Sequence, residues 1–301
     1  MGDDRAPASR SRRGRAPAPR RGLSPLARGA LALLLAGTGL LAEAAVPPAR
    51  VASLNLCSDI LLLELLDDAR IASLTHLARD PDLSPLHARA ASLPGNHGNA
   101  EELIVAAPDL VVTAGPAPPL AARLLARAGI PLLALPHAET FAAYADNLRQ
   151  LARVLGTEPR ARALLATLWQ GLGARQPPAP SATAPRALIY QPNGYTPGTR
   201  TLASELLRRA GLRDVADELG LPGGGFVTLE HLLVAAPDVI VFPVRHDSGS
   251  SLAETLLDHP ALAALRRGPH APHTVAISPA LWTCAGTHGL RAVARLAQAL
   301  P

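Results

Sequence analysis

The chain has 301 residues, of which 48% are hydrophobic and 18% charged, a length that suggests two domains with a hydrophobic core each. All 29 basic residues are Arg, and eight of them, against three acidic residues, precede residue 45. The remainder is therefore neutral, with 21 residues of each sign, which argues against a basic surface for nucleic acid. The lack of Lys excludes Walker A, Schiff-base and kinase lysines.

The N-terminal segment has the features of an export signal. Residues 1–28 are rich in Arg, Ala and Pro, residues 30–41 form an apolar run, and Ala42-Glu-Ala44 follows. The apolar run is too short to span a bilayer, and the small residues after it are typical of a cleavage site. We therefore expect residues 1–44 to be a signal peptide, cleaved near residue 44, that directs a soluble protein to the periplasm.

An internal duplication is the most informative feature of the remaining chain. Residues 99–113 resemble residues 228–242, both copies contain Val-Ala-Ala-Pro-Asp, and Glu101 and Glu230 each lie seven residues before the Pro. In both copies a short helix is expected to end at the Pro, because its ring cannot continue the hydrogen-bond ladder. The all-apolar run that follows the Pro predicts a buried parallel strand.

The flanks of the duplicated unit predict two α/β lobes. Strand-like runs at residues 50–55 and 186–191 open the two halves of the chain, and helical and strand-like patterns alternate after each of them. Alternation of this kind is typical of βαβ units and of parallel sheets covered on both faces. We predict two Rossmann-like lobes with parallel sheets, an N-terminal lobe at residues 45–136 and a C-terminal lobe at residues 186–301.

The segment between the lobes is predicted to be a helical connector. Apolar residues recur at helical spacing through residues 139–175, and Gly156-Thr-Glu-Pro159 interrupts them. Gly and Pro at that point predict a kink or a break in a long helix. Residues 176–185 are rich in Pro and Ala, as in a short linker. Connector and linker together span residues 137–185.

These features resemble the substrate-binding proteins of ABC importers for cobalamin and iron–siderophore complexes. The resemblance covers residues 50–300 and rests on the strand and loop at 51–59, the doubled Glu-x₆-Pro-Asp unit, the connector and the Leu-Trp-Thr-Cys-Ala-Gly loop at 281–286. It implies two Rossmann-like lobes bridged by a long helix, with the ligand in the cleft between them. The implied partners are the permease and its ATPase, and the implied ligand is a small-molecule metal chelate.

Candidate ligand-binding residues follow from the expected topology. In parallel α/β sheets, ligands bind beyond the carboxyl ends of the strands, and four of the chain's few aromatic residues fall in such segments. Core packing is the alternative for each aromatic residue alone, whereas the set suits stacking on a macrocycle. The protein is expected to need no cofactor, since a corrinoid, ferric siderophore or haem would be its ligand. The predicted site comprises Asn55, Cys57, His76, Tyr190, Tyr195, Phe226, Arg245 and Trp282.

The resemblance also assigns a role to the duplicated carboxylates. In the family one Glu on each lobe docks into Arg residues of the permease, and Glu101 and Glu230 match those positions. Two symmetric carboxylates would set the register of docking on a two-fold permease. The alternative is a helix-start carboxylate favoured by the helix dipole. Glu102 is a second candidate in the N-terminal lobe, and its counterpart in the C-terminal lobe is His231. We expect a monomer that docks through Glu101 and Glu230.

The two cysteines leave two outcomes open. Export permits a disulfide, and 226 residues lie between Cys57 and Cys284, so geometry decides. A bridge would staple the lobes and, by loop entropy, could stabilise the fold by about 4–5 kcal/mol. Two free thiols, one of them lining the ligand pocket, are the outcome we expect.

Three other functions remain as alternatives. A receptor for a divalent metal ion would need three or four of the chain's His residues to converge with carboxylates. A haem receptor would use Tyr or His as an axial ligand. A thiol-dependent enzyme would pair Cys57 with a distant His, but the chain has no GxSxG, HExxH or GxGxxG motif, which favours a binding protein that is not an enzyme. The His candidates are His76, His97, His137 and His246.

Overall fold

The N-terminal lobe is built on a five-stranded parallel sheet. The computed structural model describes residues 46–173, 179–244, 259–268 and 271–298. Every strand pair of this sheet is parallel, and the strand order is β3-β2-β1-β4-β5. The strands are β1 (Val51–Ser53), β2 (Ile71–Thr75), β3 (Gly95–Asn96), β4 (Leu110–Ala114) and β5 (Leu132–Leu135).

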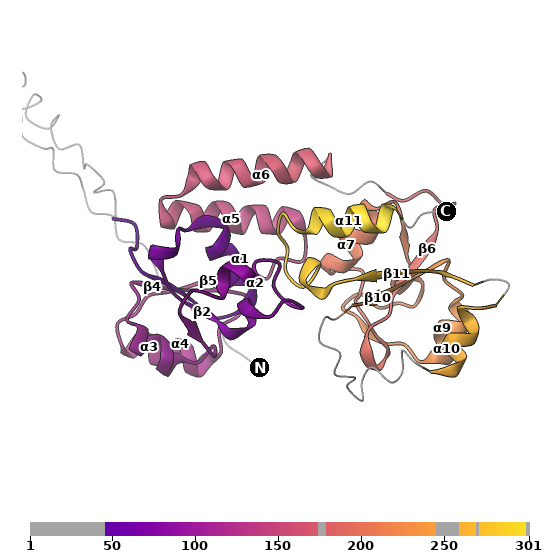
Figure 1. Ribbon diagram of the computed structural model, residues 1–301, viewed down its shortest axis with the longest axis horizontal. Helices are drawn as coiled ribbons and strands as arrows, with labels where there is room; N and C mark the ends of the chain where they lie inside the picture. Colours follow the sequence, from indigo (N-terminus) through magenta and orange to yellow (C-terminus); the bar gives the residue numbers. More distant parts are fainter. Residues whose placement is uncertain (1–45, 174–178, 245–258, 269–270, 299–301) are drawn as a thin grey trace, which may run out of the picture. The chain divides into compact units, whose positions relative to one another are not determined.

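Helices cover both faces of this sheet, and every residue of β1, β2 and β4 is accordingly buried. Val111 of β4 packs in one buried cluster with Leu103 and Leu125, and its neighbour Val112 packs in another cluster with Leu62 and Leu148. Figure 1 shows the helices of these clusters on opposite sides of the strands. The helices are α1 (Leu56–Leu65), α2 (His87–Ala90), α3 (Ala100–Ala106) and α4 (Pro119–Arg127), with 3₁₀ turns η2 (Asp68–Arg70) and η3 (His76–Arg79).

The C-terminal lobe repeats this architecture with a four-stranded parallel sheet in the order β11-β10-β6-β8. Its strands are β6 (Arg186–Ile189), β8 (Arg213–Asp214), β10 (Val239–Pro243) and β11 (His273–Ile277), and an antiparallel pair is formed by β7 (Tyr195–Thr196) and β9 (Gly225–Phe226). Its helices are α7 (Leu202–Arg209), α8 (Val215–Glu218), α9 (Leu229–Ala235), α10 (Pro260–Leu265) and α11 (Gly289–Ala297), with turns η4 (Pro192–Gly194) and η6 (Pro279–Leu281).

The duplicated sequence forms the same structural unit in both lobes. Helix α3 precedes β4 and α9 precedes β10, and each helix ends before its Pro as expected. The Asp after the Pro then joins two strands: Asp109 accepts a hydrogen bond from the backbone N–H of Arg50 at 2.8 Å, and Asp238 accepts one from Arg186 at 2.8 Å. The Pro-Asp motif therefore stops a helix and holds the start of β1 or β6.

The connector is a helical hairpin rather than one long helix. Helices α5 (Phe141–Leu155) and α6 (Glu158–Leu172) pack against each other, as Figure 1 shows. The expected break is confirmed: Gly156 ends α5 with a φ of +68°, a left-handed conformation that glycine adopts without a Cβ clash. The chain turns back there, and α6 also contacts both lobes, since Arg160 donates to Asp67 of the N-terminal lobe at 2.9 Å and α6 packs on α11.

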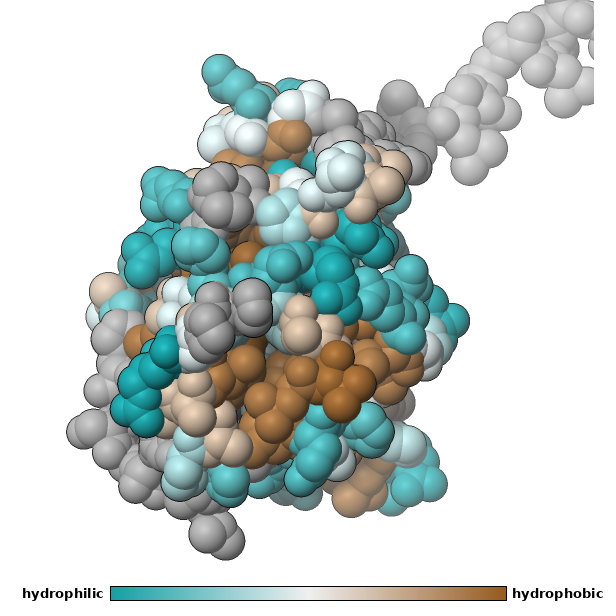
Figure 2. Space-filling view, turned by 90° about the vertical axis from the view of Figure 1, so that its right-hand side faces the viewer, coloured by the Kyte–Doolittle hydropathy of each residue, from teal (hydrophilic) through white to brown (hydrophobic). Residues whose placement is uncertain are grey.

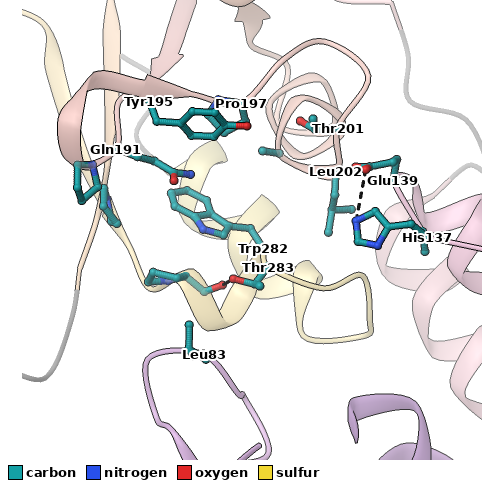
Figure 3. Close-up of a pocket in the computed structure, with 15 residues that line it drawn as sticks. Leu83, His137, Glu139, Gln191, Tyr195, Pro197, Thr201, Leu202, Trp282 and Thr283 are labelled. Atoms are coloured by element: carbon teal, nitrogen blue, oxygen red, sulfur yellow. Dashed lines mark hydrogen bonds and ion pairs between the residues drawn. The ribbon is translucent and has the colours of Figure 1, made fainter. Parts of the chain in front are cut away.

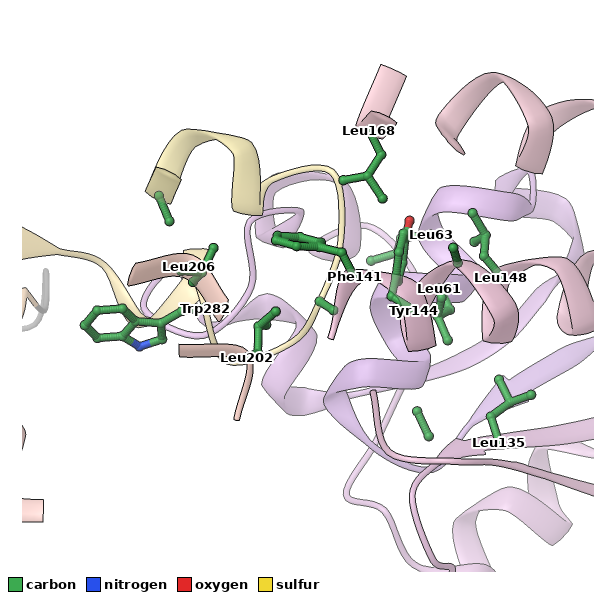
Figure 4. Packing of buried hydrophobic residues seen from close by; sticks show 14 of the residues in the cluster. Leu61, Leu63, Leu135, Phe141, Tyr144, Leu148, Leu168, Leu202, Leu206 and Trp282 are labelled. Carbon is green, nitrogen blue, oxygen red and sulfur yellow. The ribbon is translucent and has the colours of Figure 1, made fainter. Parts of the chain in front are cut away.

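Both ends of α5 are hydrogen-bonded, each to a different lobe. At its start, the backbone N–H of Phe141 donates to Glu205 of α7 at 2.8 Å. At its end, the guanidinium of Arg70 donates to the carbonyl of Leu155 at 3.0 Å. One buried hydrophobic cluster continues along this helix into both lobes, and Figure 4 shows Phe141 near Leu202 and Leu206 of the C-terminal lobe.

A disulfide between Cys57 and Cys284 joins α1 to the segment before α11, with the two Cα atoms 5.4 Å apart. Our expectation of two free thiols is wrong. Packing that the sequence does not display brings residues 227 positions apart into bonding distance, since Cys284 packs with Leu56 and Ile60 of α1. The bridge therefore links the lobes covalently.

A buried carboxylate lies at the same junction. The Tyr144 hydroxyl of α5 donates to Glu64 of α1 at 2.6 Å, and the Thr287 hydroxyl of the C-terminal lobe donates to its other oxygen at 3.2 Å. Burial raises the pKa of Glu64 above its usual value and, with the nearby Glu64 charge, raises that of Tyr144 as well. Side chains from α1, α5 and the C-terminal lobe thus meet at Glu64.

Candidate ligand-binding cleft

A cavity of about 550 Å³ opens beyond the carboxyl ends of β6, β10 and β11, where ligands of parallel α/β sheets bind. This volume lies within the range of small-molecule sites. Leu83 contributes from the N-terminal lobe, residues 137–139 from the chain between β5 and α5, and the C-terminal lobe supplies the rest. The cavity is lined by Leu83, His137, Ala138, Glu139, Gln191, Pro192, Tyr195, Pro197, Thr201, Leu202, Ala203, Pro243, Pro279, Trp282 and Thr283.

Tyr195 forms one aromatic wall, and the β7–β9 pair determines its position. Tyr195 is paired with Phe226 across the two strands, and their rings meet edge to face with centroids 5.7 Å apart. The Tyr195 hydroxyl lies 2.7 Å from the point that a Cβ on Gly224 would occupy, and Gly224 has a φ of +97°. A residue with a side chain would be strained there and would displace the phenol. Gly224 therefore makes room for Tyr195.

Trp282 forms a second aromatic wall. It is buried and belongs to the cluster that continues into α5 and α7, and Figure 3 shows its indole next to Gln191 and Tyr195. The backbone N–H of Trp282 donates to the carbonyl of Pro279 at 3.0 Å, and the disulfide at Cys284 follows two residues later. The main chain that carries the indole is therefore fixed on both sides of Trp282.

The polar groups of the cavity are few. His137 and Glu139 form an ion pair at 3.3 Å, drawn as a dashed line in Figure 3. The Thr201 hydroxyl donates to the carbonyl of Gly198 at 2.7 Å, and the side-chain amide of Gln191 lies between the aromatic rings in the same view. A mostly apolar cavity with a few polar groups suits a large organic ligand with limited charge.

Two of the predicted site residues, Tyr195 and Trp282, line this cavity. Asn55 instead caps α1, accepting from the N–H of Ser58 at 3.0 Å, and its amide donates to Thr113 and Ala114 at 2.9 Å each. His76 stacks on His97 with ring centroids 5.2 Å apart. The side-chain hydrogen-bonding groups of Asn55 are therefore used within the N-terminal lobe.

The other predicted residues have different surroundings. Tyr190 is fully buried, and its hydroxyl donates to the carbonyl of Val227 at 3.1 Å. Burial, and next the charge of Glu230, raise the pKa of Tyr190 above its usual value. Phe226 is exposed beside Tyr195. Cys57 offers no thiol to a ligand, because its sulfur is bonded to Cys284, and Arg245 lies outside the described residues.

The sequence pattern did not identify several lining residues. Pro243 ends β10 and Pro279 begins the turn after β11, so a Pro at the end of a predicted strand was an available signal. Leu83 lies in an irregular segment between η3 and α2, where nothing in the local pattern indicates a cleft. The sequence suggests His137 only as one of the candidate ligands of a metal ion.

No group of three or more His, Cys, Asp or Glu side chains that could hold a metal ion occurs among the described residues. His97 forms an ion pair with Glu102 at 3.0 Å and His137 one with Glu139 at 3.3 Å. The fourth His of that alternative, His246, lies outside the described residues. Each of these two His side chains is thus paired with one Glu, whereas the metal-ion alternative requires three or four His side chains to converge with carboxylates.

The two candidate docking carboxylates, Glu101 and Glu230, are exposed in the first turns of α3 and α9. Glu102 differs from Glu101, because it accepts hydrogen bonds from the backbone N–H of His97 at 2.6 Å and from the amide of Asn99 at 3.0 Å. The Asn99 hydrogen bond, and next those of His97, lower the pKa of Glu102. Glu102 is thus engaged in capping, which leaves Glu101 as the free carboxylate of the pair.

Two parallel α/β lobes, a helical bridge and a cleft at the strand ends define a two-lobed ligand-binding protein. The sequence matches the periplasmic binding protein family over residues 51–267, and the chain belongs to that family. This agrees with the resemblance found from the sequence. No curated protein sequence matches the chain. None of the described helices is long and apolar enough to cross a membrane.

Solved structures of similar fold carry names that refer to three different chelates. The periplasmic heme-binding protein RhuT from Roseiflexus sp. RS-1 has a TM-score of 0.67 at 22% identity, over 83% of this chain and 98% of its own. An Fe3+-hydroxamate transport protein from Saccharomonospora viridis has a TM-score of 0.62 at 20% identity, over 84% and 93%. The vitamin B12 binding protein BtuF of Vibrio cholerae has a TM-score of 0.60 at 18% identity, over 84% and 96%. These likenesses support the fold.

Proposed function

We propose that this protein is the substrate-binding component of an ABC importer and that it captures a metal chelate, cobalamin or an iron–siderophore complex. The observation that supports this best is the cavity at the strand ends, where Tyr195 and Trp282 offer flat apolar surfaces within about 550 Å³. Such surfaces suit the rim of a macrocycle or the organic shell of a siderophore.

The charge of the cavity favours a neutral or weakly charged chelate. Of the described residues that line it, none is Arg, and the only acidic or basic residues are Glu139 and His137. A strongly anionic catecholate complex would require several positive groups. Cobalamin and ferric hydroxamates place less negative charge at the walls and are therefore the first ligands to test.

Haem is a second candidate, because the cavity contains two groups that can ligate haem iron. The phenol of Tyr195 and the imidazole of His137 both belong to its lining, and Tyr and His are axial ligands in haem proteins. The several heme-binding proteins among the structural neighbours agree with this alternative.

The ligand can be identified by tryptophan quenching. The chain has two Trp, Trp169 of α6 and Trp282 of the cavity. A Trp169→Phe variant is titrated with cobalamin, a ferric hydroxamate and haem, and one of the three is expected to quench the remaining indole. The matched Trp282→Phe variant should lose most of the quenching. If none of the three ligands binds either variant or the wild type, the chelate proposal is wrong.

The proposed partner is the permease with its ATPase, approached through Glu101 and Glu230. Both carboxylates are exposed in matching units of the two lobes, and charges at a rim chiefly control encounter and orientation. The protein is proposed to be a monomer that is exported to the periplasm, loses its signal peptide by cleavage near residue 44 and performs no chemistry on its ligand. The boundaries of the lobes and of the connector remain predictions from the sequence.

A further inference from the structure

The duplicated unit exposes the same apolar residues in both lobes. On α3, Val105 is 86% exposed and Ile104 36% exposed, while on α9, Val234 is 85% and Leu233 39% exposed. These two pairs occupy matching positions, four and three residues before the Pro of the Pro-Asp motif. We call them the aliphatic pairs of the two lobes. Single exposed apolar residues need no explanation, but the same pair left exposed twice in one duplicated unit is a different observation.

Each aliphatic pair lies on the same helix face as the candidate docking carboxylate. Ile104 and Val105 are three and four residues after Glu101, and Leu233 and Val234 have the same spacing from Glu230. Residues three and four apart in a helix are neighbours on its surface. Each lobe therefore presents a carboxylate with an aliphatic patch beside it.

The surface around these residues has space for a partner. In the N-terminal lobe an open hollow of about 620 Å³ is lined by both Glu101 and Val105, together with Arg50 and His97. Figure 2 shows apolar side chains gathered low on the face that it displays, and in the C-terminal lobe Leu233 and Val234 of α9 are exposed. Both lobes thus offer apolar surface at the helix that carries the docking carboxylate.

We propose that the two aliphatic pairs are the apolar half of the permease-docking surface, so that each lobe docks through one carboxylate and one pair. This inference rests on the proposed function. The occupant is a membrane protein with two equivalent faces, since two like surfaces on one chain are satisfied together by a partner that presents the same face twice. Each face carries a cationic group opposite the Glu and apolar side chains opposite the pair.

The two halves of this surface have different roles. The carboxylates attract and orient the partner, an effect that salt screens. The aliphatic pairs lose water on docking and hold the complex together, which salt does not screen. Salt dependence therefore separates the two contributions.

The test measures the affinity of the whole protein for the permease–ATPase complex in lipid nanodiscs at low and high salt. A Val105→Ser/Val234→Ser variant is compared with Val154→Ser, which changes a valine of α5 that is 40% exposed. We expect the double variant to bind about 10- to 100-fold more weakly at both salt concentrations, with unchanged ligand affinity, and Val154→Ser to bind like the wild type.

A Glu101→Ala/Glu230→Ala variant distinguishes failure of this inference from failure of the proposed function. Its loss of affinity is expected at low salt and should shrink at high salt. If the serine variant binds like Val154→Ser while the alanine variant binds weakly, the aliphatic pairs are not part of the docking surface and the proposed function stands. If the wild type binds no permease, both proposals fail. If the wild type dimerises in sedimentation and the serine variant does not, a second copy covers the pairs and the inference is overturned.

Discussion

The two lobes hold the helix before their central strand in the same way, α3 before β4 and α9 before β10. In the N-terminal lobe the Arg50 guanidinium donates to the carbonyl of Ala106 at the end of α3, and in the C-terminal lobe Arg186 donates to that of Ala236 after α9, both at 2.9 Å. Helix ends leave carbonyls without partners, and the Arg that opens the first strand satisfies one in each lobe. The duplication therefore extends to the role of this Arg, although its acceptor is shifted by one position between the two lobes.

The lobes differ in what the segments after their strands do. In the N-terminal lobe the segment after β1 bonds to its own lobe: the Asn55 amide donates to the Thr113 hydroxyl and to the carbonyl of Ala114 at 2.9 Å each. In the C-terminal lobe, Gln191, Tyr195 and Trp282 line the cavity. Polar and aromatic residues after a parallel strand thus form a binding site only where their own lobe leaves them free.

The largest expected effect comes from breaking the covalent link between the lobes. A Cys57→Ser/Cys284→Ser variant should lose about 2–5 kcal/mol of the free energy of unfolding, since the bridge restricts the unfolded chain. Changing both cysteines avoids leaving a reactive thiol. Denaturant unfolding without reductant measures the loss, and wild-type protein with reductant should match the variant. An unchanged midpoint would show that the bridge does not form or does not stabilise the fold.

Buried ionisable groups in the two lobes should give opposite pH dependences. Burial raises the pKa of Asp59 in α1 from 3.8 to about 6, and burial lowers that of His288 beside α11 from 6.5 to about 4. The contribution of Asp59 is full below pH 4 and is lost as pH rises through 6. That of His288 is full above pH 6.5 and is lost as pH falls through 4. Each is worth about 3 kcal/mol at 1.36 kcal/mol per pKa unit.

Denaturant unfolding between pH 4 and 6.5 of Asp59→Asn and His288→Gln checks these signs. Relative to wild type, the stability of Asp59→Asn should improve as pH rises, and that of His288→Gln should improve as pH falls. If the free energy of unfolding changes with pH in the same way for the wild type and both variants, neither group has the shifted pKa given above.

The smallest expected effect concerns Gly224, which makes room for Tyr195 in the cavity of the C-terminal lobe. A Gly224→Ala change places a methyl group 2.7 Å from the Tyr195 hydroxyl at a φ of +97°, so the phenol must move and ligand affinity should fall about tenfold, or 1.4 kcal/mol. Gly223→Ala is the matched control, because a Cβ there meets nothing within 4 Å. Equal affinities for the two variants in the quenching titration would show that the ligand does not use Tyr195.

The sequence alone determined the α/β class, the two lobes, the break at Gly156 and the helix ends at Pro108 and Pro237. All of these depend on neighbours within a few residues. The period of apolar residues sets the type of element, and a Pro or Gly ends it wherever the chain goes afterwards. The duplication also indicated the family, because the Glu-x₆-Pro-Asp unit on which the resemblance rests occurs in both halves of the chain.

Only the tertiary structure decided which residues line the cleft and that Cys57 bonds to Cys284. Leu83 and Trp282 are about 200 positions apart and share one cavity, and no local pattern carries that distance. The sequence predicted both Asn55 and Trp282 as ligand-binding residues, with nothing to rank one above the other. Asn55 is used in capping α1 and Trp282 faces the cavity, because hydrogen-bond partners and packing neighbours from distant segments, rather than residue type, decide which side chains remain available to a ligand.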